Sequence, residues 1–343
     1  MGYYTKNGGL IGFGNIGDKR GVYDLIASQV IGDSLYPFSS HTFTNASTTG
    51  KDGPKLSACQ TAYSGAAFLA SYFSVTNGIQ RWTVPASGDY TFTIRGAGGG
   101  NGYTNGASYN IGGFGRILTG IINLTKGEQI DILIGQQGTN GNPAASCGGS
   151  GGGGGGGTFV YNVSTSTLLL AAGGGGGGAT WTSIDSGTTV NLQYPNGGND
   201  GLDSLGVSNP PGGSNGSGGT GATGPTYGCV AGGGGGGGFS GDGTYGNQIN
   251  DYGKSFNNSS NPGQGGTTTY RDGGFGGGGG SGNYTAGGGG GYSGGAGGGL
   301  PSCSCNRLSA GGGGGSYYNP TYVTLGSNIV GSSQSHGLFT LTA

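Results

Sequence analysis

Unbroken runs of glycine constrain the fold of this chain more than any other feature of its sequence. The longest runs span residues 151–157, 173–178, 232–238, 276–280, 287–291 and 311–315. A run without side chains cannot line a hydrophobic core, so it forms neither a buried strand nor an amphipathic helix of the usual kind. Collagen is excluded as well, because the runs carry no G-X-Y repeat.

Glycine accounts for 95 of the 343 residues, a composition that by default is typical of a disordered chain. Disordered chains usually stay open through charge and hydration, whereas here the formal net charge is -1 and only 7% of residues are charged. The apolar residues are also concentrated in residues 79–171 and sparse in 197–315. We therefore expect a sandwich core in the first region and another kind of packing in the second.

The apolar region contains short segments with the period-2 alternation of β-strands, separated by Gly, Asn and Ser. Such regularly spaced strands are typical of a jelly-roll-like sandwich. A short helix is expected near Leu56, Cys59 and Tyr63, and a helix or extended piece over Val22–Val30. The strands are predicted at 80–84, 88–94, 115–124, 129–134, 158–163, 168–171 and 338–342.

The glycine runs suit the threefold polyglycine II helix, which has no internal hydrogen bonds. Ordering one isolated run of seven residues costs about 7–14 kcal/mol, and its hydrogen bonds return only about 4–10 kcal/mol. Many runs packed side by side share their bonds in several directions, so we predict an ordered bundle of such helices. The alternative is that the runs are flexible linkers. The residues expected at the centre of the glycine lattice are Gly154, Gly175, Gly235, Gly278, Gly289 and Gly313.

Three parts follow one another along the chain. Residues 1–40 form a leader, residues 41–77 a connecting segment with the short helix, and residues 78–343 the glycine-rich sandwich, with its bundle at about 140–320. The leader is too apolar to stay free in water, so we expect it to dock on another subunit or on a particle. Its docking residues are predicted to be Leu10, Ile11, Phe13 and Ile16.

The sequence shows neither a secretory signal peptide nor an apolar stretch long enough for a membrane span, so no membrane insertion is expected. The five cysteines form an odd set without zinc-ligand spacing. We expect them to be reduced, with one long-range disulfide as the alternative.

Catalytic motifs carry little weight here. Three G-x-S-x-G matches arise by chance among so many glycines, and the two histidines lie in extended segments. The acidic stretch at 200–204 is a solvated loop rather than a strong calcium site. Twelve basic against thirteen acidic residues argue against nucleic-acid binding. We therefore predict no catalytic residue, no cofactor and no metal.

The segments between glycine runs are rich in Tyr, Asn, Ser and Thr, as recognition loops are. Soluble loops without a binding role use the same residues. If rigid rods hold these loops at their bases, recognition or subunit contact is the favoured interpretation. The candidate surface residues are Trp181, Tyr194, Tyr245, Tyr252, Tyr270, Tyr317 and Tyr318. For Trp181, Tyr317 and Tyr318, packing over the ends of the glycine helices is the alternative.

Several segments resemble the glycine-rich extracellular domain of the anaplastic lymphoma kinase and leukocyte tyrosine kinase receptors. They are GEQIDILIGQQG (127–138), LLLAAGGGGGGAT (168–180), GGFGGGGGSG (273–282) and AGGGGGYSGG (286–295). The resemblance covers roughly residues 80–343 and implies a tumour-necrosis-factor-like sandwich with inserted polyglycine helices. No ligand-contact residue carries over from that family.

A second resemblance concerns the front of the chain. NGGLIGFGNIG (7–17), followed by the segments around 41–64 and 77–99, is similar to the arrangement in structural proteins of marine bacteriophages and other large viruses. The adhesins of phage long tail fibres are also similar in their stacked polyglycine helices. No receptor-binding residue is transferable from either group.

These observations favour a non-enzymatic structural protein at the surface of a virion, such as a tail fibre, adhesin, spike or decoration. It would join other virion proteins through its leader and present a glycine-rich head for host attachment, with a receptor or glycan as the bound partner. Uncovered sheet edges favour a homo-oligomer, with a trimer expected. The alternatives are an extracellular ligand-binding module and a filament of a matrix or sheath.

Overall fold

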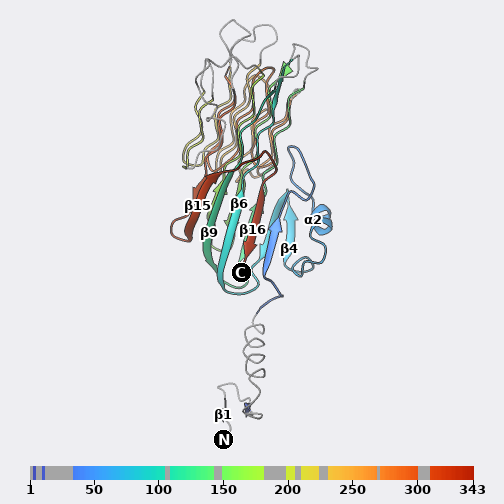
Figure 1. Cartoon of the computed structure of the whole chain (residues 1–343), viewed down its shortest axis with the longest axis vertical. Helices are drawn as coiled ribbons and strands as arrows, with labels where there is room; N and C mark the ends of the chain where they lie inside the picture. Colours follow the sequence, from blue (N-terminus) through green and yellow to red (C-terminus); the bar gives the residue numbers. More distant parts are fainter. Residues whose placement is uncertain are drawn as a thin grey trace.

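A computed structural model describes residues 3–4, 10–11, 34–104, 109–142, 149–180, 198–204, 210–223, 231–268, 271–299 and 310–343. Within these ranges the chain forms a β-sandwich whose strands continue into a bundle of extended glycine segments (Figure 1). The predicted mainly β class is therefore confirmed, and α2 (Leu56–Ala62) is the short helix predicted at this place.

Two antiparallel sheets form the sandwich. The six-stranded sheet has the order β14-β13-β12-β10-β5-β4, and the five-stranded sheet has the order β15-β9-β6-β16-β3. The first comprises β14 (Tyr317–Tyr318), β13 (Thr167–Ala172), β12 (Thr158–Asn162), β10 (Gln129–Leu133), β5 (Ile79–Thr83) and β4 (Phe73–Thr76). The second comprises β15 (Val323–Val330), β9 (Arg116–Leu124), β6 (Gly88–Arg95), β16 (Leu338–Thr342) and β3 (Ser40–Phe43).

Two small sheets complete the described strands. The strand β1 (Tyr3–Tyr4) pairs with β2 (Leu10–Ile11). At the far end of the glycine bundle, β7 (Gly102–Thr104) lies between β8 (Tyr109–Asn110) and β11 (Gly149–Ser150).

The core of the sandwich follows from the alternation of the strand sequences. In β6, Tyr90, Phe92 and Ile94 point inward and are buried, while Asp89 and Thr91 are exposed. Aromatic rings join the two sheets: Phe43 of β3 stacks on Phe339 of β16 in its own sheet, with ring centroids 5.8 Å apart, and on Phe73 of β4 in the other sheet, with centroids 6.3 Å apart. This packing gives the glycine segments a fixed base.

The glycine bundle shows its threefold geometry in its hydrogen bonds. In the segment 151–157, the amides of Gly152 and Gly155 donate to one neighbouring segment, at Gly178 and Gly175. The amides one residue further along, Gly153 and Gly156, donate to a second neighbour at Thr139 and Gln136, and Gly154 and Gly157 donate to a third at Gly279 and Gly276. Every third residue thus faces the same neighbour, as three residues per turn require.

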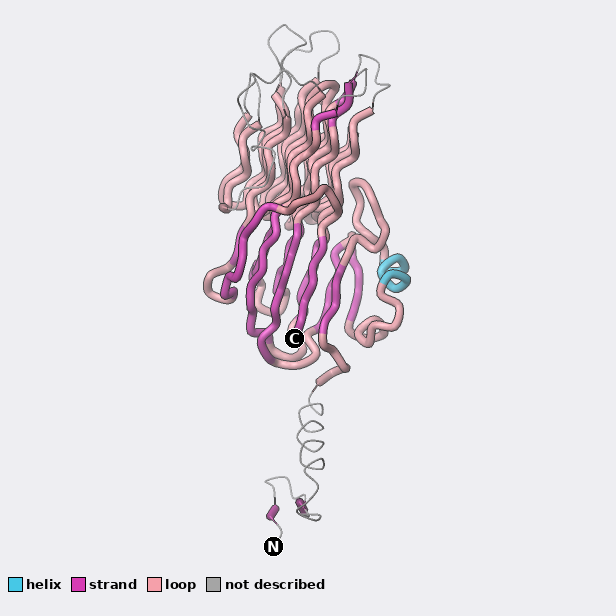
Figure 2. The backbone as a smooth tube through the Cα atoms, in the orientation of Figure 1, coloured by secondary structure: helices cyan, strands magenta, loops and turns pink. Residues whose placement is uncertain are grey.

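The bundle is therefore a lattice of polyglycine II helices, as the glycine runs predicted. Figure 2 shows its segments lying side by side as extensions of the sheets. The glycine segments pack so closely that a Cβ on most of them would collide with a neighbouring carbonyl group. Glycine is required here for close backbone approach rather than for turns.

The boundaries differ from those predicted. The sandwich takes in strands before residue 78, because β3 pairs with β16 and β4 pairs with β5. The bundle also starts before residue 140, because the glycines after β6 and β10 belong to it, as the bonds from Ala97 to Gly156 and from Gly138 to Gly98 show. The predicted piece at 22–30 lies outside the described residues.

Candidate functional site

A groove lies at the base of the glycine bundle, where three segments distant in the sequence meet. They are the connecting segment 52–56, the β4–β5 turn at 75–78 and the loop 261–264 of the bundle, with Phe275 beneath them. The groove has a volume of about 390 Å³, within the range of small-ligand sites. Its lining residues are Asp52, Gly53, Pro54, Lys55, Leu56, Val75, Asn77, Gly78, Asn261, Pro262, Gln264 and Phe275.

A second hollow of about 290 Å³ adjoins the first. Both are lined by Asn77 and Pro262, so the two hollows lie next to each other, and together they are called the groove. The second hollow opens on the outer face of the six-stranded sheet, where Arg81 Nε lies 2.6 Å from Asp131 Oδ1. This bidentate pair holds the end of the groove in a fixed geometry.

The floor of the groove depends on two glycines. A Cβ added to Gly53 would lie 2.5 Å from the Cα of Gly78 and 2.6 Å from Cζ of Phe275. Gly78 has φ +80°, a left-handed conformation that suits glycine. The turn at Gly78 therefore packs directly on Gly53, and both backbones rest on the buried Phe275 ring.

Asp52 anchors one wall of the groove. Its Oδ1 accepts a 2.7 Å hydrogen bond from Gln264 Nε2, and its backbone carbonyl accepts a 3.0 Å bond from Gln136 Nε2. Partial burial raises the pKa of Asp52, but hydrogen bonds from Gln264 and Lys51 outweigh that effect and hold the pKa below its usual value. Asp52 is thus a carboxylate at neutral pH, and its side chain stays 64% exposed beside the groove.

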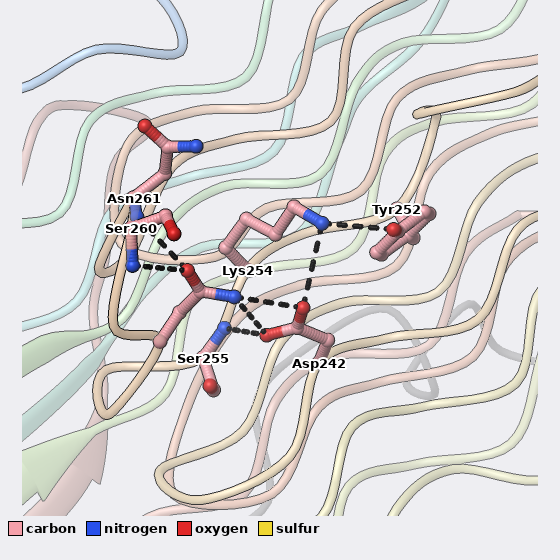
Figure 3. A network of polar contacts seen from close by, with 7 residues as sticks. Asp242, Tyr252, Lys254, Ser255, Ser260 and Asn261 are labelled. Carbon is pink, nitrogen blue, oxygen red and sulfur yellow. Dashed lines mark hydrogen bonds and ion pairs between the residues drawn. The ribbon is translucent and has the colours of Figure 1, made fainter.

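The opposite wall is held by a polar network around Asp242 (Figure 3). Asn258 Oδ1 accepts the amides of Ser260 at 3.1 Å and Asn261 at 2.9 Å, which shapes the loop. Asn258 Nδ2 in turn donates to Asp242 Oδ2 at 2.9 Å. The network therefore ties loop 258–264, which lines the groove, to the turn that follows the glycine segment 232–238.

Charge strengthens this network. Lys254 Nζ donates to the hydroxyl of Tyr252 at 2.8 Å and lies 3.4 Å from Asp242 Oδ2. Burial raises the pKa of Asp242, but the Ser255 amide, Asn258 and Lys254 outweigh it and hold the pKa below its usual value. Burial alone would lower the pKa of Lys254. Its contacts with Tyr252 and Asp242 favour the charged amine more strongly, so the pKa of Lys254 lies above its usual value. Both groups are charged at neutral pH.

The structure places the predicted surface tyrosines in different environments. Tyr245 is 60% exposed, whereas Tyr252 belongs to the network around Asp242. Tyr317 stacks on Tyr292 with centroids 4.5 Å apart, and its neighbour Tyr318, also in β14, pairs with Leu170 of β13. Tyr245 lies in the bundle loop held by Asp251, whereas Tyr317 packs where the bundle meets the sheet. Trp181, Tyr194 and Tyr270 lie outside the described residues.

The remaining predicted residues are placed as follows. Leu10 and Ile11 form β2, while Phe13 and Ile16 lie outside the described residues. Cys59 is buried and carries a free thiol, and Cys147, Cys229, Cys303 and Cys305 fall outside the described ranges. The six glycines expected in the lattice are all buried in the bundle: Gly154, Gly175, Gly235, Gly278, Gly289 and Gly313.

Sequence reasoning missed the groove residues. Asp52 and Asn261 stand in DGP and NPG stretches, which indicate turns but give no sign that the two turns meet. The lining of the two hollows contains two carboxylates, one amine, one guanidinium group, three amides and the hydroxyl of Thr76, without Ser, Cys or His. Such a set suits hydrogen-bonded binding of a ligand and offers no nucleophile paired with a base.

Two further observations concern the described part of the chain. No helix in it has the length and apolar character of a membrane span. Within the same residues, no three His, Cys, Asp or Glu side chains come together as metal ligands would.

Comparison with known proteins finds a partial similarity to a receptor. No family model matches the chain. A segment of 106 residues is 34% identical to the leukocyte tyrosine kinase receptor of Mus musculus. The match covers 30% of this chain, and the chain spans only 12% of that receptor's length. It supports the resemblance to the glycine-rich domain of these receptors and leaves the viral resemblance without support.

Proposed function

We propose that this chain is an extracellular, non-enzymatic ligand-binding module. The observation that carries the proposal is the groove at the base of the glycine bundle, whose two walls are held in place by hydrogen bonds and charge pairs. Preformed sites of this kind lose little conformational entropy when a ligand binds. The partial match to a receptor supports an extracellular binding role over a purely structural one.

The bundle has a defined part in this proposal. Its segments bond to neighbours on several sides, so it supports loop 258–264 as a stiff backing. A rigid backing keeps a binding groove open without a ligand. The bundle would thus act as a scaffold for recognition rather than as a flexible spacer.

The test uses the labelled full-length chain and a panel of cell surfaces and extracellular matrices. We expect saturable binding that unlabelled chain displaces. The variant Asn261→Trp places a large side chain in the groove and should abolish this binding. Asn257→Trp alters an exposed residue of the same loop outside the groove lining and should bind as the wild type does. Binding that survives Asn261→Trp would rule out the groove as the recognition surface.

Display on a virus particle is the second candidate. The observation that favours it is the polyglycine lattice, since phage tail-fibre adhesins are similar in this respect. In this case the leader would join other virion proteins and the head would face the host. Mass spectrometry of purified particles tests it, because the chain must then be present in a fixed copy number.

Self-association is a further part of the proposal. Strands β3 and β15 lie at the two edges of the five-stranded sheet, and Ile329 on β15 is 56% exposed. Exposed edges are commonly covered by symmetric association of identical chains, and a trimer is the expected form. Light scattering on the full-length chain tests this, and a monomer at high concentration would contradict it.

A further inference from the structure

The charged side chains of the groove are balanced. Among the lining residues, Lys55 carries one positive charge and Asp52 one negative charge. Arg81 and Asp131 line the second hollow and form an ion pair. Because the charges of the lining residues cancel, the groove has no net charge that would attract a strongly charged ligand. This favours an uncharged ligand.

The polar groups of the groove are mainly side-chain amides. Asn77, Asn261 and Gln264 line it together with the Asp52 carboxylate. Each amide both donates and accepts hydrogen bonds, and a carboxylate accepts only. A hydroxyl group has the matching chemistry, because it donates to a carboxylate while it accepts from an amide. This set is suited to a ligand with several neighbouring hydroxyl groups.

Apolar groups occupy the space between the polar ones. Pro54, Leu56, Val75 and Pro262 line the groove, and Leu56 is 38% exposed although it is aliphatic. Carbon–hydrogen faces of a ligand can pack on these side chains and displace water from them. The ligand therefore needs apolar faces as well as hydroxyl groups, a combination found in sugar rings.

The two neighbouring hollows also set the size of the ligand. Their volumes are about 390 and 290 Å³, and Asn77 and Pro262 line both. A linear ligand with two similar units would place one unit in each hollow and its linkage beside these two residues. A single small molecule would leave one of the hollows unused.

We propose that this groove binds a short neutral oligosaccharide, with Asp52, Asn77, Asn261 and Gln264 bonding to its hydroxyl groups. This inference rests on the proposed function, since it names the ligand class of the same groove. The Asp242 network takes part indirectly, because it positions the loop that carries Asn261 and Gln264.

The experiment follows the side-chain amide signals of ¹⁵N-labelled full-length chain by nuclear magnetic resonance. Cellobiose, maltose, lactose and chitobiose are added separately up to millimolar concentration, where weak binding is detectable. We expect at least one sugar to shift the amide signals of Asn77, Asn261 and Gln264 in a saturable way. Asp52→Asn keeps the acceptor for Gln264 and should weaken binding about tenfold through loss of the charged acceptor.

Two controls keep the result specific. Asp89→Asn removes an exposed carboxylate of β6 outside the groove lining and should leave sugar affinity unchanged. Asn261→Trp should abolish the shifts at Asn77. Unchanged melting temperatures for all three variants would show that the effects arise from the groove and not from unfolding.

Three results would overturn the inference. They are the absence of saturable shifts with every neutral sugar, shifts that persist in Asn261→Trp, and shifts of the same amides by anionic heparin fragments or an unstructured peptide in place of neutral sugars. If the labelled chain still binds surfaces through the groove while no sugar competes, the ligand class is wrong and the proposed function stands. If Asn261→Trp leaves surface binding intact, the proposed function itself fails.

Discussion

Gln264 Nε2 donates a 2.7 Å hydrogen bond to Asp52 Oδ1, across 212 residues of sequence. The bond joins the glycine bundle to the connecting segment between strands β3 and β4. Beside it, the amide of Gly265 donates to the carbonyl of Lys51 at 2.9 Å, and that of Phe275 donates to Gly50 at 2.8 Å. The groove therefore forms only when the sandwich and the bundle have both folded and are packed against each other.

Gln264→Ala should loosen this junction without unfolding the chain. The bond is at the surface, so we expect the free energy of unfolding to fall by about 1 kcal/mol at most. The pKa of Asp52 should rise toward its usual value, because one of the bonds that lower it is lost. Nuclear magnetic resonance titration of the Asp52 carboxyl carbon measures this rise. An unchanged pKa would show that Lys51 alone holds the carboxylate.

Gly78→Ala should damage the floor of the groove. The backbone there is left-handed, and the new Cβ would lie 2.5 Å from Gly53 Cα and 2.7 Å from Phe275 Cζ. Gly127 is the matched control, because its φ of +86° is similar and nothing lies within 4 Å of an added Cβ. We expect Gly127→Ala to lose about 1 kcal/mol, and Gly78→Ala about 3 kcal/mol, in chemical denaturation. Equal losses would mean that the collision with Gly53 and Phe275 is relieved by a small shift.

Much of the fold was predictable, because its signals are local. The alternation in residues 88–94 predicts β6 with its buried face, and the glycine runs predict a lattice since an isolated run does not stay ordered. Strand β15 was missed because Gly326 interrupts its pattern, at the irregularity between Leu325 and Ser327. Strands β3 and β4 were missed because each has only four residues and gives too short a pattern.

The groove was not predictable, for a different reason. Asp52 and Asn261 are ordinary turn residues in their local sequence, and only tertiary structure brings them to one surface. The tyrosines chosen from the sequence as contact residues show the opposite case, because some of them pack within the molecule. Tyr317 looks like a contact residue by composition, but it stacks on Tyr292, because the ends of the glycine segments need large rings to cover them.

Gly235→Ala tests whether the bundle is a packed lattice. The new methyl group would collide with the carbonyl oxygen of Gly219, and backbone atoms cannot turn aside as a side chain does. We expect a loss of about 2–4 kcal/mol and faster amide exchange in segment 232–238. Gly326→Ala is the control, because its Cβ would meet its nearest neighbour at 3.4 Å, and a change within about 0.5 kcal/mol is expected.

Rapid amide exchange throughout 232–238 in the wild-type chain would contradict the lattice directly. The amides of Gly234, Gly235, Gly236 and Gly237 donate to backbone carbonyls of other segments, so protection against exchange is expected for all four. Loss of protection in Gly235→Ala but not in Gly326→Ala would locate the effect in the bundle.

Asp251 should make the stability of the chain depend on pH. Its side chain is buried beneath a loop of the bundle and accepts the amides of Gly246 at 2.9 Å and Gln248 at 3.2 Å. Burial raises its pKa to about 6, and the two amide donors only partly oppose this rise. In the unfolded chain the pKa of an aspartate is about 3.9, so between pH 4 and 6 the folded state holds more protons.

The sign of the effect follows from this difference in bound protons. Stability falls with rising pH where the folded state binds more protons, so Asp251 should lower stability progressively from pH 4 to 6. Two units of pKa correspond to about 3 kcal/mol. Asp251→Asn keeps an acceptor for both amides and cannot ionise. Relative to the wild type, this variant should therefore gain up to about 3 kcal/mol between pH 4 and pH 7 in chemical denaturation. A difference that stays constant over that range would show that Asp251 ionises equally easily in both states.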